Sequence, residues 1–312
     1  MNNNRIITNY AQPIFVTAGA TYLDIDAYAC CVAMAELLQK KGGNAIAFSN
    51  APCNYSVCPS LIQEGQISKE CPTDGQYIIV DVSDPEFLKS SVPLDRVVAI
   101  YDHHVGFEEY WQSRIGDGTH IEFIGAAATL IYREWQKANL QSQMCRETAK
   151  LLIAAILDNT LDLTSSNTTQ EDIDAFRSLC AHANVDRAWC DSYFAQVQEG
   201  VQADMKNALF KDIKTILNNA VLPPRMSQLC VWDAESILQR LPQIRAWFAE
   251  SQESWLVNVI DIQRRCCYFL CDDPYHQQRL QEVFAVQFHD GVAKTERLYL
   301  RKEIIKKIQS IN

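Results

Sequence analysis

The residues with the clearest chemical potential are Asp102, His103 and His104, which stand next to one another in the sequence. They follow an apolar run, 97–100, that has the composition of a buried strand. A carboxylate and two imidazoles at the end of a buried strand are costly unless other groups pair with them. Both groups are also common metal ligands. The stretch therefore predicts either a metal site or an Asp–His pair that caps the strand end.

Further carboxylates stand at the ends of other predicted strands. Asp24 and Asp26 follow the apolar run 14–18, and Asp81 follows the apolar run 77–80. In an open parallel sheet, the loops at the carboxyl ends of the strands meet at one crevice. We therefore expect these aspartates to lie beside the Asp-His-His stretch. Carboxylates at that density repel one another unless cations lie among them, and two divalent metal ions would remove the repulsion.

Asp158, after a predicted helix over 146–157, could add a further ligand. Each carboxylate alone also has a simpler explanation. Asp26 could cap a helix that begins at Ala27, Asp81 could be a turn residue, and Asp158 could belong to a helix end. Their joint occurrence at the ends of predicted elements favours the metal site.

The elements that must position these residues form an alternating pattern. Near-continuous apolar strands alternate with helices in the first half, which predicts a parallel sheet with helices on both faces. The second half predicts a smaller mixed-sheet α/β domain with a hairpin through 263–265. We therefore predict an α/β protein with two domains, 1–196 and 197–312. The other expected elements are helices over 27–41, 125–138, 170–182 and 235–250, strands over 44–48, 229–232, 255–262, 266–271 and 297–300, a partly helical segment 183–204 and a mostly irregular segment 49–75.

Composition excludes several classes of protein. The formal net charge of the 312 residues is −10, which disfavours a nucleic-acid binder because that function needs a broad basic surface. No window is long and apolar enough for a membrane span, and the first residues lack the apolar core of a signal peptide. The twelve cysteines are scattered and form no Cys-x-x-Cys motif. We therefore expect a protein of the reducing cytoplasm with no membrane partner.

A basic cluster near the C-terminus offers a site for an anion. Residues 297–307 hold five Lys or Arg residues and one Glu in an otherwise acidic chain. Arg301 stands at the start of the predicted last helix, where backbone N–H groups favour anions. The alternative is a solvated terminal helix.

Taken in order, these motifs resemble the DHH phosphoesterase superfamily. The second half resembles the C-terminal domain of family II inorganic pyrophosphatases and exopolyphosphatases, in the segments 210–214 and 300–303. The motifs of the first half that carry the resemblance are Asp24-Ile25-Asp26-Ala27, Val80-Asp81, Asp102-His103-His104, Gly125-Ala126-Ala127-Ala128-Thr129 and Asp158 with the following Asn167-Thr168-Thr169.

The resemblance implies a role for each of these residues. Asp24 would bind a first metal ion, Asp26 a second, and Asp81 would bridge both. His103 and Asp158 would complete the second site. The catalytic group would be Asp81, His104, which contacts the substrate phosphate, and Asp102, which orients the histidines. Lys214, Arg301 and Lys302 of the C-terminal domain would bind the phosphate oxygens.

The resemblance also implies the reaction. Two ions, Mn²⁺ with Mg²⁺ or Co²⁺ as substitutes, would activate water to cleave a phosphoanhydride, either pyrophosphate or a short polyphosphate. The alternatives are a phosphodiesterase or phosphatase for a nucleotide or other small phosphoester, and a catalytically impaired relative. Ala20 stands where the pyrophosphatases have a metal-binding His, and Leu300 and Glu303 replace a Ser and a Lys. Since related pyrophosphatases pair through a sheet edge, the resemblance also allows a homodimer.

Overall fold

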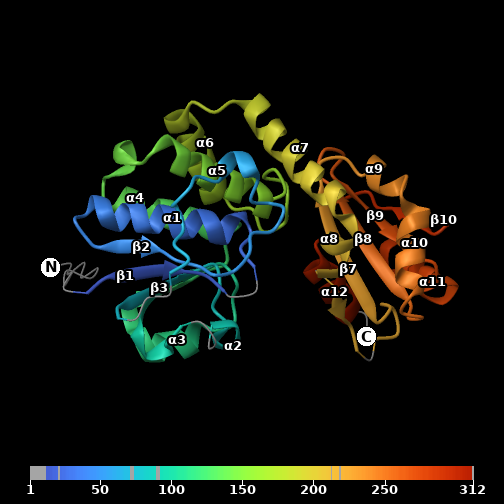
Figure 1. Cartoon of the computed structure of the whole chain (residues 1–312). Coiled ribbons are helices and arrows are strands. Elements are labelled where there is room, and N and C mark those ends of the chain that lie inside the picture. Colours follow the sequence, from blue (N-terminus) through green and yellow to red (C-terminus); the bar gives the residue numbers. More distant parts are fainter. Residues whose placement is uncertain are drawn as a thin grey trace. The chain divides into compact units, whose positions relative to one another are not determined.

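The computed structural model describes residues 12–19, 22–70, 74–88, 92–211, 213–217 and 219–310. The chain forms two compact units, Met1–Cys190 and Asp191–Asn312 (Figure 1). In the segment 183–204, which was expected to be partly helical, one helix, α7 (Arg187–Ala203), covers most of the residues. The boundary predicted between the domains, after residue 196, falls within this helix. The two-domain α/β architecture predicted from the sequence is confirmed.

The first unit contains a sheet of five strands in which every pair is parallel. The order across the sheet is β2-β1-β3-β4-β5, so β3 lies between β1 and β4. The strands are β1 (Ile14–Thr17), β2 (Ala45–Ala47), β3 (Gln76–Val80), β4 (Val97–Asp102) and β5 (Thr119–Ile121). β5 was not predicted, because only Ile121 of its three residues is buried and the apolar pattern is too short.

Helices cover both faces of this sheet (Figure 1). On one face lie α1 (Ile25–Lys40), α4 (Ala127–Lys137), α5 (Arg146–Asn159) and α6 (Gln170–Ala183). On the other lie α2 (Pro85–Leu88) and α3 (Glu108–Ile115), over a core that includes Phe15, Ile79, Ile100 and Trp111. This arrangement leaves the ends of the strands as the place where loops and side chains gather.

The start of α1 differs from the sequence expectation. The helix begins at Ile25, and its N-cap is Asp24, whose Oδ1 accepts the Ala27 N–H at 3.0 Å. Asp26 is therefore inside the first turn, and the alternative that Asp26 caps a helix beginning at Ala27 is wrong. Because Asp24 already satisfies a free N–H of the first turn, the side chain of Asp26 is left for another partner.

The segment 49–75, expected to be irregular, supports the approach to α1 with its described residues. Leu23 and Cys53 form an isolated parallel bridge, and the Ser56 hydroxyl accepts the Ile25 N–H at 2.9 Å. One short 3₁₀ turn, Pro59–Leu61, interrupts it. The segment thus fixes the chain on either side of Asp24.

The second unit contains a mixed sheet of six strands in the order β10-β11-β9-β8-β7-β6, in which only β7 and β8 pair in parallel. The predicted hairpin is present, since β8 and β9 pair antiparallel. The strands are β6 (Lys214–Thr215), β7 (Arg225–Val231), β8 (Trp255–Asp261), β9 (Cys266–Leu270), β10 (Phe288–His289) and β11 (Val292–Lys294).

Two expectations for this unit are wrong. The helix expected over 235–250 is split into α9 (Glu235–Leu238) and α10 (Leu241–Ala249), and Pro242, which has no N–H to donate, opens the second. The segment 297–300 is not a strand. Its backbone groups bond to side chains instead: the Tyr299 N–H donates to Cys267 Sγ, and the Tyr299 carbonyl accepts from Asn258 Nδ2.

The remaining helices of the second unit are α8 (Met205–Lys211), α11 (Pro274–Phe284) and α12 (Arg301–Gln309). Among the described residues of both units, no helix is long and apolar enough to cross a membrane.

Candidate metal centre

The aspartates predicted from the sequence stand at the carboxyl ends of three adjacent strands. Asp24 lies in the loop after β1, Asp81 directly follows β3, and Asp102 is the last residue of β4. Because β3 lies between β1 and β4, these ends are neighbours at one edge of the sheet. The position is the one at which open α/β sheets bind ligands.

Asp81 has an unusual backbone. Its φ is +58°, in the left-handed region, and its N–H donates to the Tyr101 carbonyl at 2.8 Å. For a residue other than Gly this conformation costs about 1–3 kcal/mol, and such costs concentrate at functional sites. The side chain is 6% exposed, and its Oδ1 has no hydrogen-bond partner among the described residues. The strained turn thus points a buried carboxylate at the edge of the sheet and leaves its Oδ1 without a hydrogen bond to the described residues.

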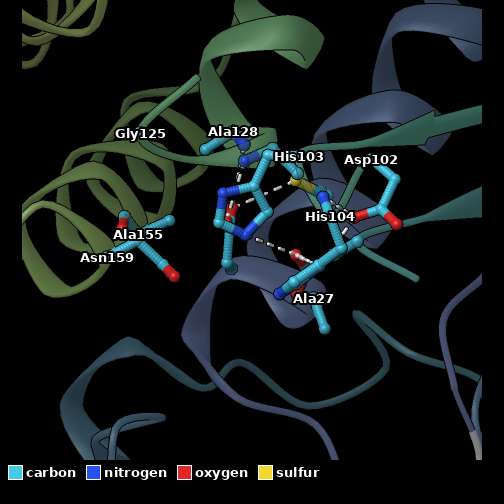
Figure 2. Close-up of polar contacts among 12 residues, drawn as sticks. Ala27, Asp102, His103, His104, Gly125, Ala128, Ala155 and Asn159 are labelled. Carbon is cyan, nitrogen blue, oxygen red and sulfur yellow. Dashed lines mark hydrogen bonds and ion pairs between the residues drawn. The ribbon is translucent and has the colours of Figure 1, made fainter. Parts of the chain in front are cut away.

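His103 presents one ring nitrogen to this carboxylate. A carbonyl can only accept, so the 3.2 Å contact between Nδ1 and the Ile124 carbonyl places the proton on Nδ1. Nε2 lies 3.4 Å from Asp81 Oδ1 and 3.9 Å from Asp26 Oδ2, and it makes no hydrogen bond to the described residues. One oxygen of Asp81 and one ring nitrogen each of His103 and His104 lie within 4.8 Å of one another. Figure 2 shows the two histidines of this group.

Asp26 is fully buried and bound to the start of α4. Its Oδ2 accepts the Ala127 N–H and its Oδ1 the Ala128 N–H, both at 2.8 Å. The Cys30 thiol, one turn further along α1, donates to Oδ1 at 3.4 Å. A helix N-terminus favours negative charge, so α4 stabilises the ionised form of this side chain.

His104 and Asp102 form a pair at the more open side of the centre. Asp102 Oδ1 accepts the His104 backbone N–H at 3.1 Å and Nδ1–H at 2.8 Å. The Ser83 hydroxyl donates to the His104 carbonyl at 3.0 Å. Asp102 is fully buried, whereas the His104 side chain is 61% exposed. Asp102 therefore orients His104, and the imidazole reaches solvent.

The charges of the centre are unbalanced. Burial, then the charge of Asp81, raises the pKa of Asp26; burial, then the charge of Asp24, raises the pKa of Asp81. In the outer pair, burial opposes ionisation of Asp102, but the hydrogen bonds from His104 and Ser83 and the charge of His104 together outweigh it and lower the pKa of Asp102. Burial likewise lowers the pKa of His104, but the hydrogen bond to Asp102 and the charges of Asp81 and Asp102 together outweigh it, and the net shift of the pKa is upward.

These features fit a divalent cation. Asp81 Oδ1 and His103 Nε2 are buried atoms that can bind a metal ion, and neither has a hydrogen-bond partner among the described residues. Leaving buried polar atoms without a partner is costly. A cation among them would satisfy both atoms and would favour the ionised carboxylates. A ligand set of carboxylate oxygens and imidazole nitrogen suits Mn²⁺ and related ions.

The other predicted residues are Asp158, Ala20 and three basic residues of the second unit. Asp158 is in the last turn of α5 and is not in the group formed by Asp81 and the two histidines. The side chain of the next residue, Asn159, donates to the Ala155 carbonyl at 3.5 Å (Figure 2). Ala20 lies outside the described residues. In the second unit, Lys214 is exposed in β6, and Arg301 and Lys302 are the first two residues of α12.

Several contacts of the centre were not predicted from the sequence. The Cys30 thiol contacts Asp26, and the Ser83 hydroxyl contacts His104. Ala127 and Ala128 belong to the 125–129 motif, but the binding of Asp26 by their backbone N–H groups was not predicted. The spacing of four residues between Asp26 and Cys30 on one helix was a usable signal. No local pattern indicates the backbone donors, because their partner is about a hundred residues away in the chain.

Solved structures with the same fold include two of the predicted kind. The chain is similar to a putative family II inorganic pyrophosphatase from Methanococcus jannaschii, with a TM-score of 0.67 and 16% identity over 95% of this chain and 98% of that one. It is also similar to an exopolyphosphatase-related protein from Bacteroides fragilis, with a TM-score of 0.53 and 11% identity over 96% and 91%. The chain therefore has the fold of these two structures.

Curated proteins that are similar to this chain share one description. The chain is 24% identical to a probable manganese-dependent inorganic pyrophosphatase of Deinococcus radiodurans, over 92% of this chain and 95% of that protein. It is 22% identical to a protein of the same description from Lactobacillus helveticus, over 90% and 92%. No family model matches the chain. The comparisons confirm the predicted resemblance to family II inorganic pyrophosphatases and exopolyphosphatases.

Proposed function

We propose that this protein is a metal-dependent phosphohydrolase that cleaves a phosphoanhydride, either pyrophosphate or a short polyphosphate. The observation that carries the proposal is the group formed by Asp81, His103 and His104, in which the buried atoms Asp81 Oδ1 and His103 Nε2 converge without a hydrogen-bond partner among the described residues. The similarity to probable manganese-dependent pyrophosphatases along nearly the whole of both chains supports the choice of substrate.

Mn²⁺ is the ion expected at this centre, with Mg²⁺ or Co²⁺ as substitutes. Bound cations of this kind lower the pKa of water and neutralise phosphate oxygens. We propose that Asp81 would contact both ions, because its carboxylate lies close to both Asp24 and His103. We assign Asp24, Asp26, Asp81, His103 and Asp158 as ligands, and the first four are supported by their gathering at the edge of the sheet.

His104 is proposed to bind the substrate phosphate. Its Nδ1–H is held by Asp102, which raises the pKa of the ring after burial has lowered it, and so favours the protonated form. A protonated imidazole donates from Nε2 to a phosphate oxygen. Lys214, Arg301 and Lys302 are proposed to neutralise the remaining phosphate charge. The N-terminal position of Arg301 and Lys302 in α12 suits an anion.

The test is a phosphate-release assay on the purified chain with Mn²⁺. The panel contains pyrophosphate, tripolyphosphate, a dinucleotide and a cyclic dinucleotide. We expect release from one of the first two, loss of activity in Asp81→Asn, and full activity in the matched control Asp117→Asn, whose side chain is exposed away from the centre. Release only from the nucleotides would refute the proposed substrate. Release that survives Asp81→Asn would refute the proposed centre.

A further inference from the structure

Residues 124–126 and the first two residues of α4, together called the 124–128 loop, hold two of the proposed ligands. The Ile124 carbonyl accepts from His103 Nδ1 and thereby keeps Nε2 free of a proton in the neutral ring. The N–H groups of Ala127 and Ala128 bind both oxygens of Asp26. The orientation of His103 and the position of Asp26 therefore depend on where this loop lies.

Asp172, on the first turn of α6, binds that loop from behind. Its side chain is fully buried; Oδ2 accepts the Gly125 N–H at 3.0 Å, and Oδ1 accepts the Thr129 hydroxyl at 2.6 Å. Asn167 binds the other backbone group of Gly125, since its Nδ2 donates to the Gly125 carbonyl at 3.2 Å. The side chains of Asp172 and Asn167 thus fix both backbone groups of Gly125.

Asp172 packs closely against Gly125. A Cβ atom on Gly125 would lie 2.6 Å from Asp172 Oδ2 and 2.6 Å from the Thr160 methyl, closer than side chains approach. The same Oδ2 accepts the Thr169 N–H and hydroxyl, both at 2.7 Å, in the capping box that starts α6. One carboxylate therefore fixes the helix start and the loop to each other.

The chain reaches this arrangement through a strained turn. Leu161, Asp162 and Leu163 all have positive φ values, between 50° and 61°. Left-handed residues other than Gly usually occur singly, so three in a row persist only where the surrounding structure holds them. Here the Leu163 N–H donates to the Thr160 hydroxyl, and Arg187 pairs with Asp162 at 2.7 Å. The turn carries the chain from the end of α5 to Asn167.

We propose that Asp172, assisted by Asn167, is the positioning residue of the metal centre: through Gly125 it sets the loop that fixes the His103 tautomer and holds Asp26. Its consequence for catalysis rests on the proposed function, but its effect on His103 does not. A purely structural role for Asp172 would lower stability and leave the His103 ring unchanged.

The test compares Asp172→Asn with variants that separate positioning from stability. In Asp172→Asn, an amide N–H group replaces an acceptor and faces the backbone or hydroxyl donors. Leu179→Ala is the matched control, because it removes fully buried packing from the same helix without contacting the loop. Thr129→Ser is the conservative variant, because it keeps the hydroxyl that Asp172 accepts.

The first readout is the ¹⁵N NMR spectrum of His103 in the metal-free full chain, and the second is Mn²⁺ affinity by calorimetry. We expect the wild-type protein, Leu179→Ala and Thr129→Ser to show the single tautomer with the proton on Nδ1. In Asp172→Asn we expect a mixture of the two His103 tautomers, and Mn²⁺ binding that is about 10–100-fold weaker than in the wild-type protein. Asn167→Ala, which leaves the Gly125 carbonyl without its donor, is expected to move both readouts in the same direction.

A wild-type tautomer and unchanged affinity in Asp172→Asn would overturn the proposal, even if its melting temperature falls as far as that of Leu179→Ala. If Asp172→Asn does not fold, Asn167→Ala decides by the same criterion. A wild-type protein that binds no Mn²⁺ and releases no phosphate would refute the proposed function. The tautomer comparison would still support or overturn the positioning role in that case.

Discussion

Asp26 and Asp81 are both proposed ligands, yet their surroundings predict opposite effects of the same substitution on the metal-free protein. Both oxygens of Asp26 accept backbone N–H groups of α4. Asp81 Oδ1 has no partner among the described residues, and its carboxylate lies beside that of Asp24. Asp26→Asn should therefore destabilise the metal-free protein, and Asp81→Asn should not.

The structure gives the size of the difference. In Asp26→Asn, an amide N–H group must replace one acceptor, and a bond to a carboxylate together with an unpaired buried donor is worth about 2–4 kcal/mol. For a unit of this size, that loss lowers the melting temperature by roughly 4–16 °C. Asp81→Asn removes a buried charge whose pKa is raised, and one unit of such a shift is about 1.4 kcal/mol. Asn also tolerates the positive φ at this position.

The assay is thermal unfolding of both variants in EDTA at pH 7.5, repeated with saturating Mn²⁺. Asp81→Asn should melt at or above the wild-type temperature in EDTA, and Asp26→Asn should melt below it. Both should lose most of the increase that Mn²⁺ gives the wild-type protein. Equal destabilisation of the two variants in EDTA would refute the assignment of a structural role to Asp26 and an unpaired role to Asp81.

Three further results are expected. Because a raised carboxyl pKa gives stability that is present below the ordinary value and lost as the pH rises through the raised one, the Mn²⁺-induced increase in melting temperature should grow from pH 5.5 to 8; a constant increase would contradict the raised pKa values. Asp102→Asn removes the group that favours protonated His104, so the alkaline limb of the kcat/KM profile should move to lower pH and kcat should fall about 10–100-fold. An alkaline limb at the wild-type pH would show that this limb does not report the ionisation of His104. Gly125→Ala should lower the free energy of unfolding by about 1–3 kcal/mol in urea titrations, because its Cβ would overlap Asp172, and an unchanged midpoint would contradict the close approach.

The strand-end aspartates could be predicted because two simple rules agree. Apolar runs such as 77–80 define buried parallel strands, and the ends of such strands meet at one edge. The structure accordingly places Asp24, Asp81 and Asp102 after neighbouring strands. Elements that lack a long apolar run escaped prediction. β5 has one buried residue, and of the eight residues of α3 only Trp111 is buried.

The support of the centre could not be predicted from local patterns. Thr169 and Asp172 have the spacing of an ordinary capping box. The capping role alone explains an Asp at position 172, so the sequence gives no reason to expect a second role for it. The bond from Asp172 to Gly125 joins residues 47 positions apart, so no local spacing indicates it. The same holds for the 297–300 segment, whose apolar pattern suggests a strand. Its backbone is instead bound by side chains of β8 and β9.

The central claim is that Asp81 and His103 bind a catalytic metal ion between them. A crystal structure of the full chain grown with MnCl₂, with anomalous data collected on both sides of the manganese absorption edge, tests it most directly. We predict a manganese peak in contact with Asp81 Oδ1 and His103 Nε2, the two buried atoms that now lack hydrogen-bond partners among the described residues. Full occupancy of manganese at other sites, with no peak between these two side chains, would contradict the account.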